Sequence, residues 1–328
     1  MLWLCCCILL GSQDVAGTRD AAASPTIRVA SYNVLNLFDH EDDPAIGGDV
    51  DDIDEQITDG RCRSLAAAIR TVDADVLALQ EIESEAALLW FRDTYLADMG
   101  YDHVVSLDVG YFRGVENAVL SRFPLSNASA PPNIPINDVV RHASPQPSWD
   151  RGDGKGGWAK PRKGDTEETY QRTPLRVDVE TEAGYEMTLF VVHHKSGNNR
   201  FRREGEALKL VELVNEVRAD APHRNIILLG DFNASPWDRS MDVYRDAGFI
   251  DVLADPTVER QKTHHSGGAI DFILMNSASH RELVPGSPQV HKIKLAPNDF
   301  NWRSESQPDD CPSDHRPISV DLADGDQL

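Results

Sequence analysis

The chain has 328 residues, of which 41% are hydrophobic, and its formal net charge is −22. This length allows one large α/β domain or two small ones, and the composition excludes an intrinsically disordered chain. Because so acidic a surface repels polyanions on average, a phosphate-bearing substrate would have to be held by local positive charge or by a metal ion. Simple solubility is the plainer explanation of the charge.

The first 23 residues are typical of a signal peptide followed by a short linker. The segment is apolar from Leu2 to Leu10 and then polar, which is too short to span a bilayer. A lipoprotein leader, suggested by Cys5 to Cys7, is the less favoured alternative. We therefore expect a secreted or periplasmic protein without stable membrane insertion, whose mature domain comprises residues 24–328.

Hydrophobic periodicity predicts alternating strands and helices through the rest of the chain. The sequence shows neither an internal repeat nor a change of composition that would mark a second domain. Helices are expected at 61–72, 85–99, 201–217 and 241–248. Strands are expected at 27–33, 75–81, 101–107, 116–121, 175–180, 187–193, 225–231, 269–275 and 317–322.

Residues from about 127 to 169 interrupt this pattern and predict a long insertion loop within the domain. The loop carries two tryptophans, Trp149 and Trp158, among clustered basic residues, which suits contacts to a phosphate-bearing substrate. A solvated loop is an equal alternative. The basic residues are Arg151, Lys155, Lys160, Arg162 and Lys163.

Side chains that can bind a metal ion or transfer a proton lie at the ends of the predicted strands. Strand ends bordering loops are where α/β sheets build functional sites. Carboxylate and amide oxygens suit Mg²⁺, Mn²⁺ or Ca²⁺, whereas histidines suit proton transfer near neutral pH. The residues are Asn33, Glu81, His193, Asp231, Asn233, Asp271, Asp314 and His315.

Five motifs in this order resemble the endonuclease/exonuclease/phosphatase superfamily, whose members are deoxyribonuclease I-like. The resemblance extends over about residues 27–322, and two further stretches, residues 36–44 and 193–196, resemble bacterial exported nucleases. The motifs are Tyr32-Asn33-Val34-Leu35-Asn36, Leu79-Gln80-Glu81, Gly230-Asp231-Phe232-Asn233, Ile270-Asp271-Phe272-Ile273 and Ser313-Asp314-His315-Arg316-Pro317.

The resemblance implies a four-layer α/β/β/α sandwich, with two mixed sheets flanked by helices and the site at one edge. It implies that Glu81 is the main metal ligand, with Asn33 and Asp314 near the metal. The expected cofactor is Mg²⁺, with Mn²⁺ or Ca²⁺ as alternatives.

The resemblance also implies catalytic roles for the remaining strand-end residues. Asp231 would position or deprotonate the attacking water, and Asn233 would bind a phosphate oxygen. His315, oriented by Asp271, would act in acid/base catalysis or stabilise the transition state.

The second catalytic histidine is one of two adjacent residues, His193 and His194, which a strand would point to opposite faces. The family pattern favours His193, which would polarise the phosphate, and Glu116 is a candidate to orient it. Arg172, in an Arg-Thr-Pro-Leu sequence, matches a family pattern and could contact phosphate.

Removal of the leader would leave Cys62 and Cys311, and two cysteines in an exported protein suggest a disulfide. Two free thiols are the alternative.

The acidic stretch of residues 41–55 could hold calcium, but it lacks an ordered ligand spacing such as that of the EF-hand. A solvated loop is therefore favoured there.

The sequence thus predicts a metal-dependent phosphodiesterase, and within that class a secreted nuclease acting on DNA or RNA. The rival is a phosphodiesterase or phosphatase for lipid or small phosphate esters, because the superfamily shares one core and varies its loops. A non-catalytic binding domain would lack several of the acidic and histidine residues present here. We expect a monomer with a nucleic acid substrate and no protein partner.

Overall fold

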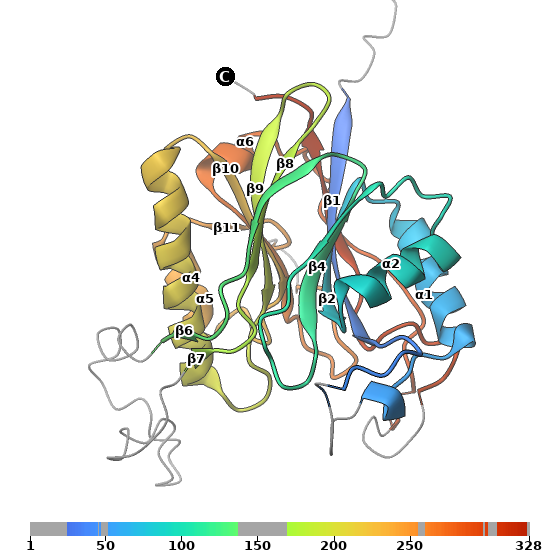
Figure 1. The fold of residues 1–328 in the computed structure, drawn as a ribbon. Coiled ribbons are helices and arrows are strands. Elements are labelled where there is room, and N and C mark those ends of the chain that lie inside the picture. The colour runs from blue at the N-terminus through green and yellow to red at the C-terminus, as the bar shows by residue number, and fades with distance from the viewer. Residues whose placement is uncertain are drawn as a thin grey trace, which may run out of the picture.

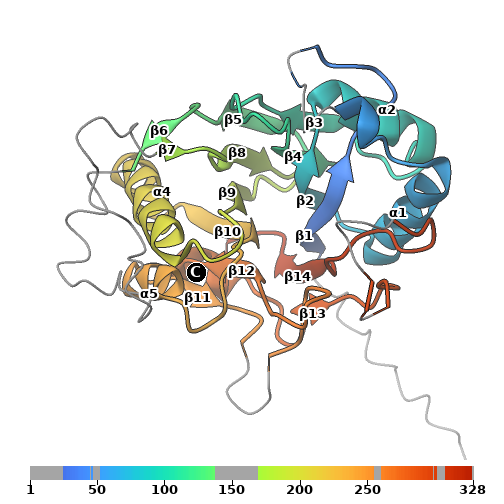
Figure 2. The same cartoon turned by 90° about the horizontal axis from the view of Figure 1, so that it is seen from below.

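Two six-stranded sheets stack face to face, with helices on both outer sides (Figures 1 and 2). This computed structural model describes residues 25–44, 46, 52–136, 169–254, 260–297, 299–300 and 307–326. Each sheet contains one parallel pair of strands among antiparallel ones, so both are mixed. The predicted four-layer α/β/β/α sandwich is confirmed.

The first sheet has the strand order β13-β14-β1-β2-β4-β3. Strands β1 and β2 run parallel, while β14 and β4 run antiparallel to their neighbours. The bounds are β13 (Gln289–Val290), β14 (Ile318–Ala323), β1 (Thr26–Leu37), β2 (Val76–Ile82), β4 (Glu116–Ser121) and β3 (His103–Ser106).

The second sheet has the order β11-β12-β10-β9-β8-β5, with β9 and β10 parallel. A separate two-stranded ribbon joins β6 (Ile134–Pro135) to β7 (Thr169–Tyr170). The bounds are β11 (Ile250–Asp251), β12 (Asp271–Met275), β10 (Asn225–Asp231), β9 (Glu186–His193), β8 (Leu175–Glu180) and β5 (Leu125–Ser129).

The helices cover the outer faces of the two sheets (Figure 2). Helices α1 (Asp59–Val72) and α2 (Glu85–Tyr95) lie outside the first sheet, and α4 (Arg200–Asp220) and α5 (Arg239–Asp246) outside the second. The short α6 (Ser277–Arg281) and the 3-10 helix η2 (Asp52–Asp54) complete the described elements. Among the described residues, we find no helix with the length and hydrophobicity of a transmembrane segment.

Three hydrophobic layers hold the sandwich together, and their residues follow the sequence periodicity. In α1, Leu65, Ala68, Ile69 and Val72 recur at helical spacing and pack on the outer face of the first sheet. A second layer lies between the sheets, and a third lies under α4 and α5. Because both faces of each central strand are buried, these strands are continuous apolar runs rather than alternating ones.

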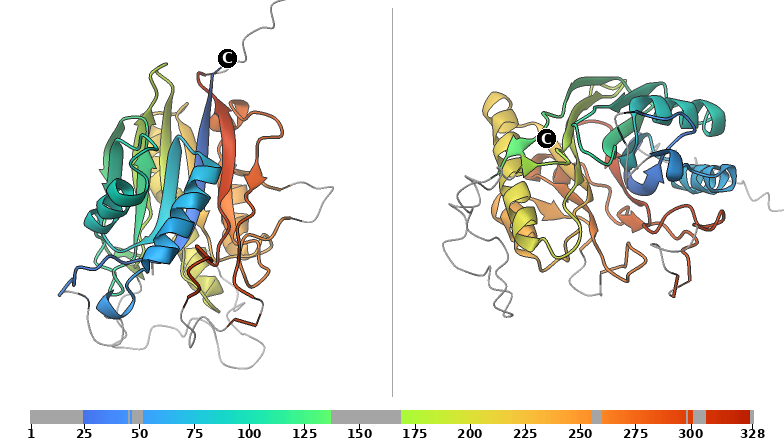
Figure 3. Two further views of the ribbon diagram at one scale, coloured as in Figure 1. Left: turned by 90° about the vertical axis from the view of Figure 1, so that its right-hand side faces the viewer. Right: turned by 60° about the horizontal axis from the view of Figure 1, so that its bottom comes forward.

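The strands of both sheets stand nearly upright in the left view of Figure 3, so their ends gather at two opposite ends of the molecule, here called poles. Strand β1 starts at the top of Figure 1, where the described chain also ends. The motif residues come at the end of β1, β2, β9 and β10 and at or before the start of β12 and β14, which run antiparallel to them. All motifs therefore meet at the opposite pole.

The structure differs from the sequence prediction in short or marginal elements. Residues 125–129 form the edge strand β5 on β8, so the interruption predicted from residue 127 begins later, and residues 134–135 and 169–170 pair with each other. Helix α2 ends at Tyr95 rather than residue 99. Helix α6 and the two-residue strands β11 and β13 were missed, because such short segments show no measurable period.

Two sequence expectations fall on residues 1–24 and 137–168, which lie outside the described residues. These are the signal peptide and the basic stretch from Arg151 to Lys163.

The suggested disulfide is not formed, because Cys62 and Cys311 are both free and buried. Cys62 belongs to the hydrophobic layer beneath α1, beside Leu65 and Ala66. The Cys311 thiol instead lies 3.6 Å from a carboxylate oxygen of Asp310. Helix α1, which carries Cys62, and the loop that carries Cys311 are neighbours, but the two thiols have different surroundings.

Gly230 offers a test of the pairing that positions the site. Its φ of 144° and its place against β9 mean that an added Cβ would overlap the carbonyl oxygen of Val192. We expect Gly230→Ala to lower the free energy of unfolding by about 3 kcal/mol or more, measured by urea denaturation. Gly184→Ala, at a positive φ with open space around it, should cost only about 1 kcal/mol. Equal losses would contradict the steric explanation.

Candidate active site

Three polar residues stand side by side on one rung of the second sheet. The backbone of Asp231 on β10 is in register with His193 on β9 and with Asp271 on β12. Neighbours in register project from the same face of a sheet. Two residues earlier in β10, Leu229 belongs to the layer between the sheets, so the rung faces the first sheet.

Glu81 reaches this interior only because the backbone of β2 is irregular. Leu77 and Leu79 face α1 and α2, and simple alternation would send Glu81 the same way. Glu81 instead has φ 65°, and the register with β4 shifts between Gln80 and Ile82. This bulge redirects the Glu81 carboxylate into the space between the sheets.

Asn33, at the end of β1, connects the two sheets. Its Nδ2 donates to Glu81 Oε1 at 3.2 Å within its own sheet and to Asp231 Oδ2 at 3.2 Å in the other. His193 Nε2 lies 3.5 Å from Glu81 Oε1 and 3.6 Å from Asp231 Oδ2. Four of the predicted site residues are therefore within direct contact of one another.

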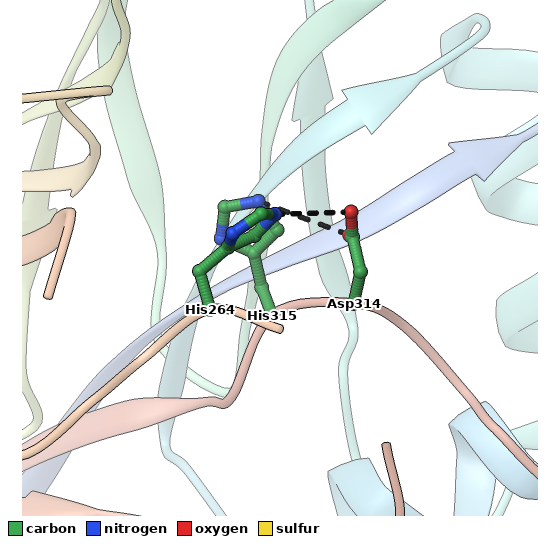
Figure 4. Close-up of side chains that lie close together, drawn as sticks. All are labelled: His264, Asp314 and His315. Atoms are coloured by element: carbon green, nitrogen blue, oxygen red, sulfur yellow. Dashed lines mark hydrogen bonds and ion pairs between the residues drawn. The ribbon is translucent and has the colours of Figure 1, made fainter. Parts of the chain in front are cut away.

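The loop before β14 adds Asp314 and His315, which Figure 4 shows together with His264. His315 Nδ1 lies 3.0 Å from both carboxylate oxygens of Asp271, and its Nε2 lies 3.7 Å from Asp231 Oδ2. Asp314 Oδ2 lies 3.1 Å from His264 Nε2. His264, which the sequence analysis did not assign to the site, thus contacts it directly and packs edge to face on His315.

The two adjacent histidines face opposite sides of the second sheet. His194 is fully buried toward α4 and α5, where its Nδ1 lies 3.0 Å from the Tyr170 hydroxyl and its Nε2 lies 2.6 Å from the Tyr244 hydroxyl. Glu206 approaches its Nδ1 at 3.3 Å. Only His193 faces the interior cluster, as the family pattern favoured.

Arg172 and Asn233 support residues of the cluster. The Arg172 guanidinium contacts the His193 ring, with Nδ1 at 3.1 Å. Asn233 Nδ2 donates to Asp231 Oδ2 at 2.8 Å and to the carbonyl of His194 at 3.0 Å. Because these two bonds use both amide hydrogens, Asn233 positions Asp231 in this arrangement rather than offering a donor to phosphate.

The two site histidines have opposite electrostatic surroundings. Burial lowers the pKa of His193 well below its usual value, and the nearby Arg172 charge lowers it further, so the ring is neutral. Burial would also lower the pKa of His315, but the carboxylates of Asp271, Asp231 and Asp314 outweigh it and raise the pKa well above the usual range. The site therefore holds one neutral imidazole and one imidazolium.

The donor set fits a hard divalent cation. Burial raises the pKa of the Asp231 carboxyl above its usual value. Asp314 Oδ1 is buried without a hydrogen-bond partner, and Glu81 contacts only amide, backbone N–H and imidazole groups among the described residues. These oxygens suit Mg²⁺, Mn²⁺ or Ca²⁺.

Arg61 is a buried residue that the sequence analysis did not single out for the site. It is 4% exposed, and its guanidinium donates to the carbonyl of Pro312 at 3.2 Å and that of Asn36 at 3.1 Å. It also donates to the carbonyls of Val34 and Leu35. One side chain thus fastens the end of β1 to the loop carrying Asp314 and His315. No sequence signal distinguishes it from an ordinary helix-surface arginine.

Glu116 does not orient His193. It is 4% exposed, its Oε2 has no hydrogen-bond partner, and its carboxyl lies by the backbone N–H of Val109 and the Asp108 carboxylate. Burial raises the pKa of Glu116 to about 8, and Asp108 adds to the shift. The side chain is therefore a buried acid of the strand β4, held protonated at neutral pH.

We expect Glu116→Gln to stabilise the protein increasingly as pH rises. A raised native pKa means that native Glu116 keeps a proton that the unfolded chain loses, so stability is lost between about pH 4.5 and pH 8. The neutral amide avoids this loss. Urea denaturation should show an advantage of the variant that grows by on the order of 3 kcal/mol from pH 4.5 to pH 8.5. Glu180→Gln, at an exposed strand position, is the control, and a pH-independent difference for Glu116→Gln would refute the explanation.

Comparison with known proteins places this architecture in a family. The sequence model of the Endonuclease/Exonuclease/phosphatase family matches residues 30–315. A search of curated proteins found no match.

Several solved structures share the fold. The human nocturnin catalytic domain has a TM-score of 0.54 at 18% identity, over 91% of this chain and 94% of that one. An endonuclease/exonuclease/phosphatase family protein from Bacteroides thetaiotaomicron gives 0.54 at 19%, over 91% and 98%. A mannosyl-6-phosphatase from the same species gives 0.52 at 19%, over 90% and 98%. Together with the family match over most of the chain, this architecture shows that the protein belongs to the endonuclease/exonuclease/phosphatase family of phosphoester hydrolases.

Proposed function

We propose that the protein is a divalent-metal-dependent phosphodiesterase whose substrate is nucleic acid. The observation that carries the proposal is the buried cluster in which Asn33 and Glu81 of one sheet meet His193 and Asp231 of the other. A non-catalytic binding domain has no need to bury two carboxylates and an imidazole in contact, because burying charge is costly.

Glu81, Asn33 and Asp314 would hold the metal ion. When bound, a divalent ion supplies positive charge that polarises a phosphate ester and stabilises the charge of the transition state. Mg²⁺ is the proposed ion, with Mn²⁺ and Ca²⁺ as alternatives suited to the same oxygen ligands.

The chain's own residues supply proton transfer and orientation. Asp231, whose pKa is raised by burial and which Asn33 and Asn233 orient, accepts a proton from the attacking water. The His315 imidazolium, held by Asp271, stabilises the negative charge that develops on the phosphoryl oxygens or protonates the leaving oxygen. Neutral His193 and Arg172, which contact each other, would bind a phosphate oxygen.

A nucleic acid is favoured over a lipid or small phosphate ester by the motifs shared with exported nucleases and by the basic, tryptophan-containing stretch from Arg151 to Lys163. Arg113, which forms an ion pair with Glu55 at 3.7 Å, lies on a described loop near the site, and its charge also acts on His193. Local positive charge of this kind offsets the −22 net charge that repels a polyanion. We propose that the enzyme is exported and acts as a monomer without a protein partner.

Plasmid cleavage tests the proposal. The purified chain should nick supercoiled plasmid in the presence of Mg²⁺ or Mn²⁺, and EDTA should abolish nicking. His315→Ala and Asp231→Asn should each slow the reaction by about 10³-fold, because each removes a proton-transfer or charge-stabilising group. If plasmid and RNA stay intact while bis-p-nitrophenyl phosphate is hydrolysed, the nucleic acid assignment is wrong and small esters are the substrates. Loss of both activities would reject the catalytic assignment.

The two adjacent histidines should separate activity from stability. His193→Gln should slow metal-dependent nicking by about 10²-fold and change the free energy of unfolding little, since His193 faces the site. His194→Ala should lower the free energy of unfolding by about 2–4 kcal/mol, because Tyr170, Tyr244 and Glu206 lose a buried partner. The folded fraction of that variant should keep its nicking rate. Measured by urea denaturation and nicking assays, the reverse pattern would show that the roles are exchanged.

A further inference from the structure

The stretch from Asp39 to Asp59 contains ten acidic residues and no Lys or Arg. A solvated acidic loop keeps its carboxylates in water, and Asp54 and Asp59 are exposed in this way. Asp52, on η2, is different, because it is only 2% exposed. It meets another buried acid, Glu83, which follows β2 and is 8% exposed. A solvated loop therefore does not describe this part of the stretch.

The two carboxyl groups are close enough for Asp52 to act on the Glu83 carboxyl. Glu83 Oε2 accepts from the backbone N–H of Asp39 at 2.8 Å, and Asp52 Oδ2 accepts from that of Asp43 at 2.9 Å. Asp52 Oδ1 is buried and has no hydrogen-bond partner. No cationic side chain of the described part of the chain forms an ion pair with either group.

Two adjacent carboxylates removed from water repel each other and lose their hydration, and this is tolerated only if a positive charge or a proton lies between them. The ligands on offer are all oxygens, with the Asp39 carboxylate also near Glu83. Oxygen-only sites suit hard cations, and Ca²⁺ accepts irregular sets of six to eight oxygens including carbonyls and waters. Mg²⁺ requires a stricter octahedron, which two carboxylates on separate segments do not impose.

We propose that Asp52 and Glu83 bind a structural Ca²⁺ ion, separate from the active-site metal. The ion fastens η2 to the chain directly after β2, two residues beyond Glu81. No local sequence pattern indicates this site, because its two ligands are 31 positions apart in the sequence and come together only in the fold. The inference does not depend on the proposed substrate.

Calorimetric titration of CaCl₂ into the chelator-treated full chain tests this inference. The titration uses a Glu81→Gln background, which weakens calcium binding at the active site, and about 0.15 M NaCl to suppress diffuse binding to the acidic surface. We expect one saturable site per chain and a rise in Tm of about 5 °C at calcium concentrations far above Kd.

Asp52→Asn and Glu83→Gln, each added to that background, should abolish the binding and the rise in Tm. Asp54→Asn is the matched control, since it removes the same charge from an exposed position of the same 3-10 helix, and it should retain both. Circular dichroism checks that each variant is folded, and either buried-site variant alone decides the test. Absence of a saturable site, or equal binding in all variants, would overturn the proposal. Tighter binding of MgCl₂ than of CaCl₂ would overturn the assignment to calcium.

Discussion

The hydrogen bond from Asn33 to Asp231, which joins the two halves of the site, depends on the stacking of β1 against β10 across the central apolar layer. Each sheet by itself carries only half of the cluster. The parallel pairs β1–β2 and β9–β10 bring the ends of four strands to one pole, and the interdigitated side chains between the sheets set how closely those ends approach. Since packed interiors have density close to that of organic crystals, a shift of the sheets would separate the two halves. The hydrophobic layer between the sheets therefore sets the positions of the site's side chains.

Charge balance is the second requirement of this pole. Carboxylates buried between two sheets need positively charged partners. In this cluster only one of the two site histidines carries a positive charge. His315 is held charged by Asp271 and its neighbours, whereas His193 is kept neutral beside a guanidinium. The two histidines can therefore perform different tasks, because their surroundings give them different protonation states. Arg61 adds its own buried charge to hold the backbone of two site loops together.

Two site residues have an irregular backbone conformation that directs their side chains. Glu81 and Asn233 both have positive φ values, 65° and 48°, which non-glycine residues adopt at a cost. At Glu81 this conformation turns a carboxylate from the helix-covered face to the inter-sheet face. At Asn233 it lets one side chain bond Asp231 and the carbonyl of His194 together. The surrounding sheet pairing and core packing hold these conformations in place.

In the sequence, long apolar runs predict the strands, and the resemblance of the contiguous motifs at their ends to the superfamily implies the four-layer sandwich and the candidate site residues. The sequence also predicts the major helices, whose apolar stripes are long enough to show a period. Which side chains these residues contact depends on the tertiary structure. Glu81 faces the site through a bulge that alternation does not predict, and Glu116 turns away from His193 into a buried pocket of its own. The same is true of the cysteines, which stay unpaired, and of Asp52, which lies beside Glu83. Contacts between distant segments are set by how the layers pack, which no local pattern of residues encodes.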